Sequence, residues 1–253
     1  MYLALGGAPV TPSTIQAEGR TLTEFGFERV SVPRALTTDE VAGLSGQYRH
    51  AAECAKRAGF DGVEVYSANS YLLDQFIRDP TNKRTDKYGG SIENRTRLTR
   101  EIVAAVLEVW DSGSVGIRLS STTPDAGNTP IDSQVMEIYG YLIDKLNAYD
   151  LAYLHFVEGA TAGSRDLPEG VDLDALRKRF KGVYMGNNGY DLELAIERRK
   201  AGFVDLVAFG RPFIASPDLV ERFKQSKPLA ESTRDDYYGG GAKGYTDWSP
   251  ATA

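Results

Sequence analysis

The chain contains 253 residues, of which 42% are hydrophobic, and it carries a formal net charge of −6 at pH 7. Because the chain is acidic and its Lys and Arg residues are scattered, we expect neither nucleic acid nor an anionic membrane as a partner. The single cysteine, Cys54, excludes an internal disulfide and any metal cluster that needs several cysteines of this chain. No apolar run reaches about 18 residues and the N-terminus lacks a signal-peptide pattern, so the expected location is the cytoplasm.

Three parts follow one another along what we interpret as a single domain, residues 1–253. Residues 1–36 contain many Gly, Pro, Ser and Thr and show no lasting hydrophobic period, which predicts a loop-rich first segment. Residues 37–226 alternate between short apolar runs and amphipathic segments. Residues 227–253 are expected to form a C-terminal tail.

Five short, mostly apolar runs predict β-strands at residues 62–67, 115–120, 151–157, 182–186 and 205–210. Runs of this length and composition are typical of strands that are covered on both faces in a parallel sheet. Strand and helix alternate five times in succession. This alternation indicates the α/β class with right-handed crossover connections.

Helix boundaries are predicted from capping residues. Thr38 precedes two acidic residues and Gly59 ends the same periodic segment, so we expect them to mark the two ends of the first helix. Ser91 is the expected N-cap of the next long helix, and Asp132 or Ser133 that of the one after. Three later helices are predicted at about residues 172–180, 191–201 and 217–225.

The segment after the first predicted strand contains many specific polar residues. Residues 62–95 read GVEVYSANSYLLDQFIRDPTNKRTDKYGGSIENR, and residues 4–13 read ALGGAPVTPS. Both segments resemble the Old Yellow Enzyme family, the FMN-dependent ene-reductases built on a (β/α)8 barrel. The resemblance extends from about Gly6 to Trp248. The part from residue 82 to residue 95 is expected to be architectural, with Gly89 and Gly90 turning the chain and charged residues holding the loop together.

In that family, a loop similar to residues 4–13 follows the third barrel strand, so the five predicted strands match the fourth to the eighth. The resemblance therefore implies an α/β fold of the TIM-barrel family, here an N-terminally incomplete barrel with about five of eight βα units. An open barrel leaves unpaired backbone groups at two sheet edges and an exposed interior. Such a chain requires a complementing N-terminal segment, a second copy in a homo-oligomer or a rearranged closure. Truncation of the gene model is the plainest explanation.

The resemblance also implies a substrate site at the end of the first predicted strand. Tyr66 and Asn69 match the two positions that hydrogen-bond the carbonyl oxygen of the substrate, although the family usually has a histidine at the first of them. Polarising that oxygen makes the β-carbon electrophilic. A changed substrate pocket and a relaxed site in a decaying gene both explain Tyr66. Tyr71 matches the tyrosine that protonates the α-carbon, a task suited to a phenol with a pKa near 10; the alternative is that it packs at the start of a helix.

A flavin site is implied at the ends of the later strands. Arg118 matches the arginine beside the flavin pyrimidine, where a cation favours the anionic reduced form. Glycine-rich turns after the last two strands allow backbone N–H groups to approach a phosphate, and barrels commonly bind phosphate there. The residues expected at this phosphate site are Gly186, Asn187, Asn188, Gly189, Gly210 and Arg211.

The sequence therefore predicts a non-covalent FMN enzyme that takes electrons from NADPH or NADH. The expected substrate is a small electrophilic alkene such as an enone, a maleimide or a nitro compound, whose activated C=C bond is reduced. The alternative is a catalytically silent or partner-completed barrel fragment that binds FMN weakly or not at all. The iron–sulfur relatives of this family are excluded, because a single cysteine cannot hold a cluster.

Overall fold

The computed structural model describes residues 8–23, 26–123, 130–160, 164–233, 236–237 and 241–250. Five parallel strands form its central sheet, in the order in which they occur along the chain. They are β5 (Val63–Ser67), β6 (Val115–Ser120), β7 (Tyr153–Val157), β8 (Tyr184–Asn187) and β9 (Leu206–Ala208). All five predicted strands are confirmed, with ends that differ by no more than two residues.

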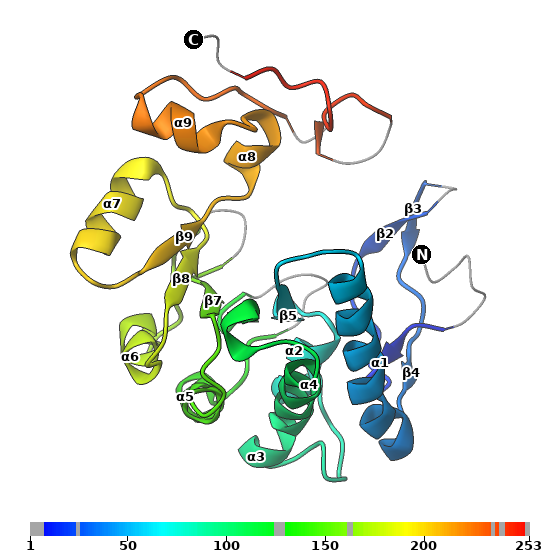
Figure 1. Cartoon of the computed structure of the whole chain (residues 1–253). Helices are drawn as coiled ribbons and strands as arrows, with labels where there is room; N and C mark the ends of the chain where they lie inside the picture. Colours follow the sequence, from blue (N-terminus) through cyan, green and yellow to red (C-terminus); the bar gives the residue numbers. More distant parts are fainter. Residues whose placement is uncertain are drawn as a thin grey trace.

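Helices connect the strands and lie along one side of the curved sheet (Figure 1). In chain order they are α1 (Thr38–Arg57), α2 (Leu72–Ile77), α3 (Ile92–Arg95), α4 (Arg97–Leu107), the 3-10 turn η2 (Ser112–Ser114), α5 (Val135–Leu146), α6 (Leu173–Arg179), α7 (Leu192–Lys200), α8 (Arg211–Ala215) and α9 (Leu219–Lys224). The sequence did not predict α2 and α8, which are six and five residues long and too short to show a helical period. None of the described helices is long and apolar enough to cross a lipid bilayer.

The prediction that residues 1–36 are loop is wrong for part of this segment. β1 (Val10–Thr11) pairs in parallel with β4 (Arg34–Ala35), and β2 (Arg20–Thr23) pairs with β3 (Gly26–Arg29) as an antiparallel hairpin. These strands are two to four residues long. Their pairing partners, rather than a local hydrophobic pattern, determine their conformation, so periodicity alone did not reveal them.

Two of the predicted N-caps are also wrong. The N-cap of α1 is Thr37 and not Thr38: the Thr37 hydroxyl oxygen accepts from the Glu40 N–H, and the Glu40 carboxylate accepts from the Thr37 N–H. The N-cap of α5 is Gln134 and neither Asp132 nor Ser133: the Asp132 carboxylate pairs with Arg95 and accepts from the Gln134 N–H, and the Ser133 hydroxyl donates to Asp79. The prediction of Gly59 just beyond α1, where φ is +84°, is confirmed. Ser91 is an N-cap as predicted, but of the four-residue α3, and the long helix α4 begins separately after Thr96.

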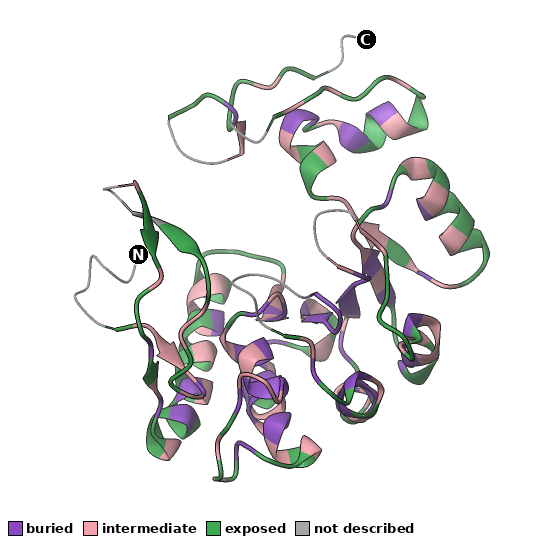
Figure 2. Ribbon diagram, turned by 180° about the vertical axis from the view of Figure 1, so that it is seen from behind, coloured by how far each residue is buried: buried purple, intermediate pink, exposed green. Residues whose placement is uncertain are grey.

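The two faces of the sheet have different surroundings. Val65, Ile117 and Leu154 are adjacent in register and buried in the core that the sheet shares with the helices. The neighbouring row on the opposite face consists of Tyr66, Arg118, His155, Met185 and Leu206. On that face the exposed fraction of Leu206 is 46%. Figure 2 shows the buried residues gathered in β7, α4 and α5, whereas the β2–β3 hairpin is largely exposed.

Hydrogen bonds in the segment 82–95 agree with the architectural role expected for it. The Arg84 guanidinium donates to the carbonyl oxygens of Pro12 and Leu36 and to the Asp86 carboxylate. Asp86 in turn accepts from the Thr38 hydroxyl at 2.6 Å. The segment therefore fastens the N-terminal strands and the start of α1 to the rest of the molecule.

Replacing Asp86 by Asn should destabilise the fold at neutral pH but not in acid. Arg84 first, and then the Thr38 and Tyr88 hydrogen bonds, hold the pKa of Asp86 at about 2, below its usual 3.8. Because the folded-state pKa is lowered, this stabilisation is present above about pH 4 and is lost as the pH falls through about 2. Urea midpoints of the two proteins at about pH 7 and about pH 2.5 test this prediction, and an equal midpoint difference at both values would contradict it.

Candidate functional site

The C-terminal ends of β8 and β9 border a cavity of about 500 Å3. In a parallel sheet these strand ends lie at the same edge, together with the end of β6, so residues far apart in sequence come together. Six of the residues predicted to bind the cofactor line this cavity: Arg118, Asn187, Asn188, Gly189, Gly210 and Arg211.

Gly186, the seventh predicted residue, is not among the lining residues. Side chains alternate along a strand, so Asn187 faces the cavity and Gly186 faces the opposite side of β8. A Cβ atom at Gly186 would lie 2.7 Å from the Tyr190 hydroxyl oxygen and 2.9 Å from a Val204 methyl group. Close packing therefore requires a glycine here.

Two arginines give the cavity its charge. Arg118 donates to the side-chain oxygen of Asn187 at 3.0 Å, and the Asn187 amide nitrogen donates to the Ala208 carbonyl oxygen at 2.9 Å. Among the described residues, no carboxylate forms an ion pair with Arg118 or with Arg211, and the Arg211 side chain has no hydrogen-bond partner there. The buried Nε of Arg118 also lacks an acceptor within this part of the chain. Two cations without a carboxylate partner in the described part of the chain make the cavity suitable for an anion.

Tyr66, Asn69 and Tyr71 lie together beside Arg118. The Asn69 side chain donates to the Tyr66 hydroxyl oxygen at 2.5 Å, and the Arg118 guanidinium donates to it at 3.4 Å and lies over the Tyr66 ring. The rings of Tyr66 and Tyr71 meet edge to face with centroids 5.3 Å apart. Since the Tyr66 oxygen accepts two hydrogen bonds, its own hydrogen is free to be donated to an oxygen acceptor.

A tight turn produces this arrangement. Asn69 and Ser70 have φ angles of +52° and +61°, a conformation that is costly for non-glycine residues. The turn is held by two backbone N–H groups, because Asn69 donates to the Ser120 hydroxyl at 2.7 Å and Ser70 to the Asp74 carboxylate at 2.8 Å. Asp74 is fully buried.

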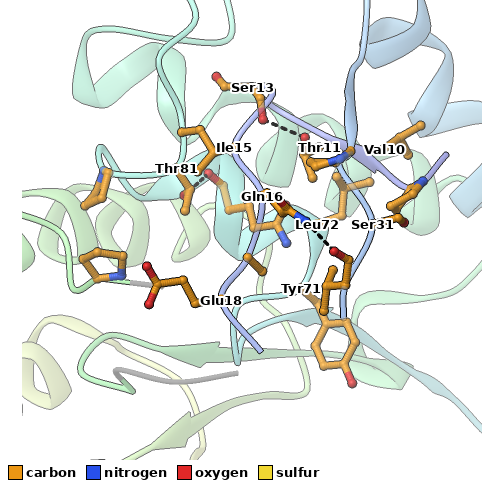
Figure 3. Close-up of a pocket in the computed structure, with 17 residues that line it drawn as sticks. Val10, Thr11, Ser13, Ile15, Gln16, Glu18, Ser31, Tyr71, Leu72 and Thr81 are labelled. Atoms are coloured by element: carbon orange, nitrogen blue, oxygen red, sulfur yellow. Dashed lines mark hydrogen bonds between the residues drawn. The ribbon is translucent and has the colours of Figure 1, made fainter. Parts of the chain in front are cut away.

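A second cavity, of about 740 Å3, lies between the N-terminal segment and α2 (Figure 3). Its lining combines apolar residues such as Val10, Ile15 and Leu72 with the polar Gln16, whose amide donates to the Val30 carbonyl oxygen at 2.6 Å. Tyr71 lies at the border of this cavity, and its ring extends away from the other labelled residues (Figure 3). With 62% of its surface exposed, Tyr71 is accessible to a molecule bound there.

A comparison with known proteins agrees with this arrangement. Residues 7–230 match the model of the NADH:flavin oxidoreductase / NADH oxidase family. The chain belongs to this family. Among solved structures of similar proteins, morphinone reductase in complex with tetrahydroNAD is 44% identical, with a TM-score of 0.89 over 98% of this chain and 68% of that one. The old yellow enzyme homologue from Zymomonas mobilis is 38% identical, with a TM-score of 0.91 over 97% of this chain and 69% of its own.

Plant relatives of this NADH:flavin oxidoreductase family are also similar. The chain is 40% identical over 223 residues to 12-oxophytodienoate reductase 1 of Oryza sativa subsp. japonica, which covers 86% of this chain. This chain spans 58% of the length of that relative. The resemblance to the Old Yellow Enzyme family is thus confirmed, and so is the α/β-barrel type of fold.

A group of residues near the cavity was missed by the sequence analysis of this family member. Glu158, only 3% exposed, accepts from the hydroxyls of Tyr184 and Tyr190 and pairs with Arg165 at 2.7 Å. Burial first, and then Glu158, raises the pKa of Tyr190 to about 12. Glu158 directly follows β7, and its place at the C-terminal end of a barrel strand was a signal that could have identified it.

Proposed function

We propose that this chain binds FMN and takes part in the NAD(P)H-dependent reduction of activated C=C bonds. The observation that carries the proposal is the 500 Å3 cavity that joins Arg118 to residues 187–189 and to Arg211. Its two arginines have no carboxylate partner among the described residues. A ligand with a phosphate at one end and an electron-accepting ring at the other matches this distribution of charge.

The residues present fit FMN. The volume lies within the range of about 300–1,000 Å3 that is usual for cofactor sites. Gly189, Gly210 and Arg211 would hold the phosphate, because glycine backbone can approach an anion closely and Arg211 supplies a charge. Arg118 would hold the pyrimidine edge of the flavin. When bound, FMN would supply hydride transfer, which no side chain of the chain can provide.

The acceptor would be activated by Tyr66 and protonated by Tyr71. The Tyr66 hydroxyl accepts from Asn69 and from Arg118, and such donors polarise it toward donating its own hydrogen. That hydrogen would bind the carbonyl or nitro oxygen of the acceptor and stabilise the negative charge that develops there. The edge-to-face contact of Tyr66 with Tyr71 keeps the proton donor next to this oxygen site.

Similar proteins support the reaction class. One of them is named 12-oxophytodienoate reductase, and another, morphinone reductase, has been solved with tetrahydroNAD. From these names we infer that the substrate is a small electrophilic alkene and that the reductant is NADPH or NADH.

We infer further that the five strands are part of a single (β/α)8 barrel domain, of which this chain contributes about five βα units. In the part that the structure describes, β5 and β9 pair on one side only. A complementing segment or a second copy would then cover the open face. A catalytically silent or partner-completed fragment is the second candidate function, favoured by the 46% exposure of Leu206 on that face.

Titration of the purified chain with FMN, followed by the flavin absorbance and fluorescence of the bound fraction, tests the proposal. Arg118→Met should weaken FMN binding roughly 10- to 100-fold, since a hydrogen bond to a charged group contributes about 1.5–3 kcal/mol. Arg49→Met, an exposed arginine paired with Glu108, is the control and should bind FMN like the unmodified chain. A chain that binds no FMN would favour the silent fragment, and equal binding by Arg118→Met would remove that arginine from the site.

A further inference from the structure

Arg165 links a buried carboxylate to the turn that borders the cavity. One guanidinium nitrogen donates to the Glu158 carboxylate at 2.7 Å, and another donates to the carbonyl oxygen of Asn188 at 2.8 Å. The guanidinium also lies over the Tyr190 ring, 4.6 Å from its centroid. Arg165 thus contacts residues on both sides of Gly189.

The turn that it contacts has an unusual conformation. Asn188 and Gly189 both have positive φ angles, +89° and +67°. The Asn188 side chain donates to the carbonyl oxygens of Glu158, Ala160 and Ser164. Glycine adopts such angles freely, but at the non-glycine Asn188 a positive φ persists only where its surroundings hold it, and positions of this kind concentrate at ligand sites.

The contact with Arg165 also decides which way a backbone N–H group points. In a planar trans peptide, the carbonyl of Asn188 and the N–H of Gly189 point in opposite directions. Arg165 lines a separate small cleft with Glu158 and Arg198 and is not among the residues that line the 500 Å3 cavity. When Arg165 holds the Asn188 carbonyl on its own side, the Gly189 N–H is directed to the other side. Within the described part of the chain this N–H has no acceptor, and Gly189 lines the cavity.

We propose that Arg165, itself fixed by Glu158, is a positioning residue that presets the Gly189 N–H for an anionic group, the phosphate of the flavin. This inference rests on the proposed FMN function. The buried Glu158 holds Arg165 in place, and the hydroxyls of Tyr184 and Tyr190 also donate to this carboxylate. Glu158 and Arg165 therefore act on the phosphate through the backbone of residues 188 and 189 and do not contact the phosphate themselves.

The test compares the unmodified chain with Arg165→Ala and Arg165→Lys. Arg179→Ala is the matched control, because Arg179 forms an exposed ion pair with Asp144 away from the cavity. Lysine keeps the charge but lacks the planar fork that holds two acceptors, so both Arg165 variants should behave alike. Two measurements are made on each protein: amide hydrogen exchange of the backbone at residues 187–190 without ligand, and the dissociation constants of FMN and riboflavin.

In the Arg165 variants, amide hydrogen exchange at residues 187–190 should be several-fold faster, which is about the effect of losing one hydrogen bond. In Arg179→Ala, the exchange rates of these residues should not change. FMN should bind roughly 10-fold more weakly while riboflavin, which lacks the phosphate, changes less than about 2-fold. Unchanged exchange, or an equal loss of FMN and riboflavin affinity, would overturn the positioning role. If the unmodified chain binds no FMN, the proposed function fails, and the exchange measurement alone still decides whether Arg165 holds this turn. Should Arg165→Ala fail to fold, Arg165→Lys provides the same comparison.

Discussion

Replacing Asp74 by Ala is expected to lower the free energy of unfolding by about 3–5 kcal/mol, because it leaves a buried arginine without its counter-ion. Asp74 and Arg78 are both fully buried and form an ion pair at 2.8 Å. The Asp74 carboxylate also accepts from the Tyr139 hydroxyl at 2.9 Å and from the Ser70 N–H at 2.8 Å. Removing it leaves the Ser70 N–H without its acceptor and the Arg78 charge without its counter-ion, whereas the Tyr139 hydroxyl can still donate to the Ser120 carbonyl oxygen.

Equilibrium unfolding in urea, followed by circular dichroism, measures this loss. Lys224→Gln is the control: its ion pair with Glu221 is exposed on one turn of α9, and exposed pairs contribute little to stability. We expect the unfolding midpoint of that variant to match that of the unmodified chain. A loss below about 1 kcal/mol for Asp74→Ala would mean that the interior relaxes enough to solvate Arg78.

The same substitution should also affect the candidate site. Asp74 holds the Ser70 N–H, and through it the left-handed turn that places Asn69 against the Tyr66 hydroxyl. A conservative variant, Asp74→Asn, keeps an acceptor for this N–H. It separates the role of the carboxylate charge from its role in the turn.

Replacing Tyr71 by Phe is expected to slow acceptor reduction by about 10²–10⁴-fold, the usual contribution of a general acid. Flavin reduction by NAD(P)H should remain nearly the same, because the proton is needed only when the acceptor carbon is reduced. Stopped-flow absorbance separates the two half-reactions. Since 62% of Tyr71 is exposed, loss of its hydroxyl should not alter stability.

Tyr245→Phe is the matched control, because Tyr245 is exposed to a similar extent, 58%, and lies in the C-terminal tail. Its two half-reactions should match those of the unmodified chain. An unchanged rate of acceptor reduction in Tyr71→Phe would remove Tyr71 from the role of proton donor. A parallel decrease in both half-reactions would indicate a changed flavin site instead.

The order of elements could be read from the sequence because each central strand carries its own signal. Short apolar runs such as residues 115–120 are buried on both faces, and burial of that kind produces a continuous hydrophobic pattern. The strands β1 to β4 are only two to four residues long and lack such a pattern; β1 pairs with the distant β4, and β2 and β3 form a largely exposed hairpin. Tertiary contacts also bear on the capping error at α5: Asp132 is a good N-cap by residue type, but its carboxylate pairs with Arg95, 37 residues earlier, and the helix begins only after Gln134.

The sequence also located most of the candidate site. Strand ends in a parallel sheet meet at one edge, so residues at or just after the ends of β6, β8 and β9 could be assigned to a common site before their positions were known. Motif similarity added Tyr66, Asn69 and Tyr71 at the end of β5. Side chains alternate along β8, so Gly186 and Asn187 face opposite sides of the sheet. Which of the two faces the cavity became clear only from the strand register in the structure.

By itself, the sequence thus determined the α/β class, the chain order of the parallel strands and the family, because these depend on local hydrophobic patterns and on contiguous motifs. Only the tertiary structure decided in which direction each side chain and each backbone N–H group points, and which side chains form hydrogen bonds with the same partner. The link from Glu158 through Arg165 to the Asn188 carbonyl joins residues up to 30 positions apart. Such contacts depend on side-chain geometry in the folded molecule, and no spacing along the chain records them.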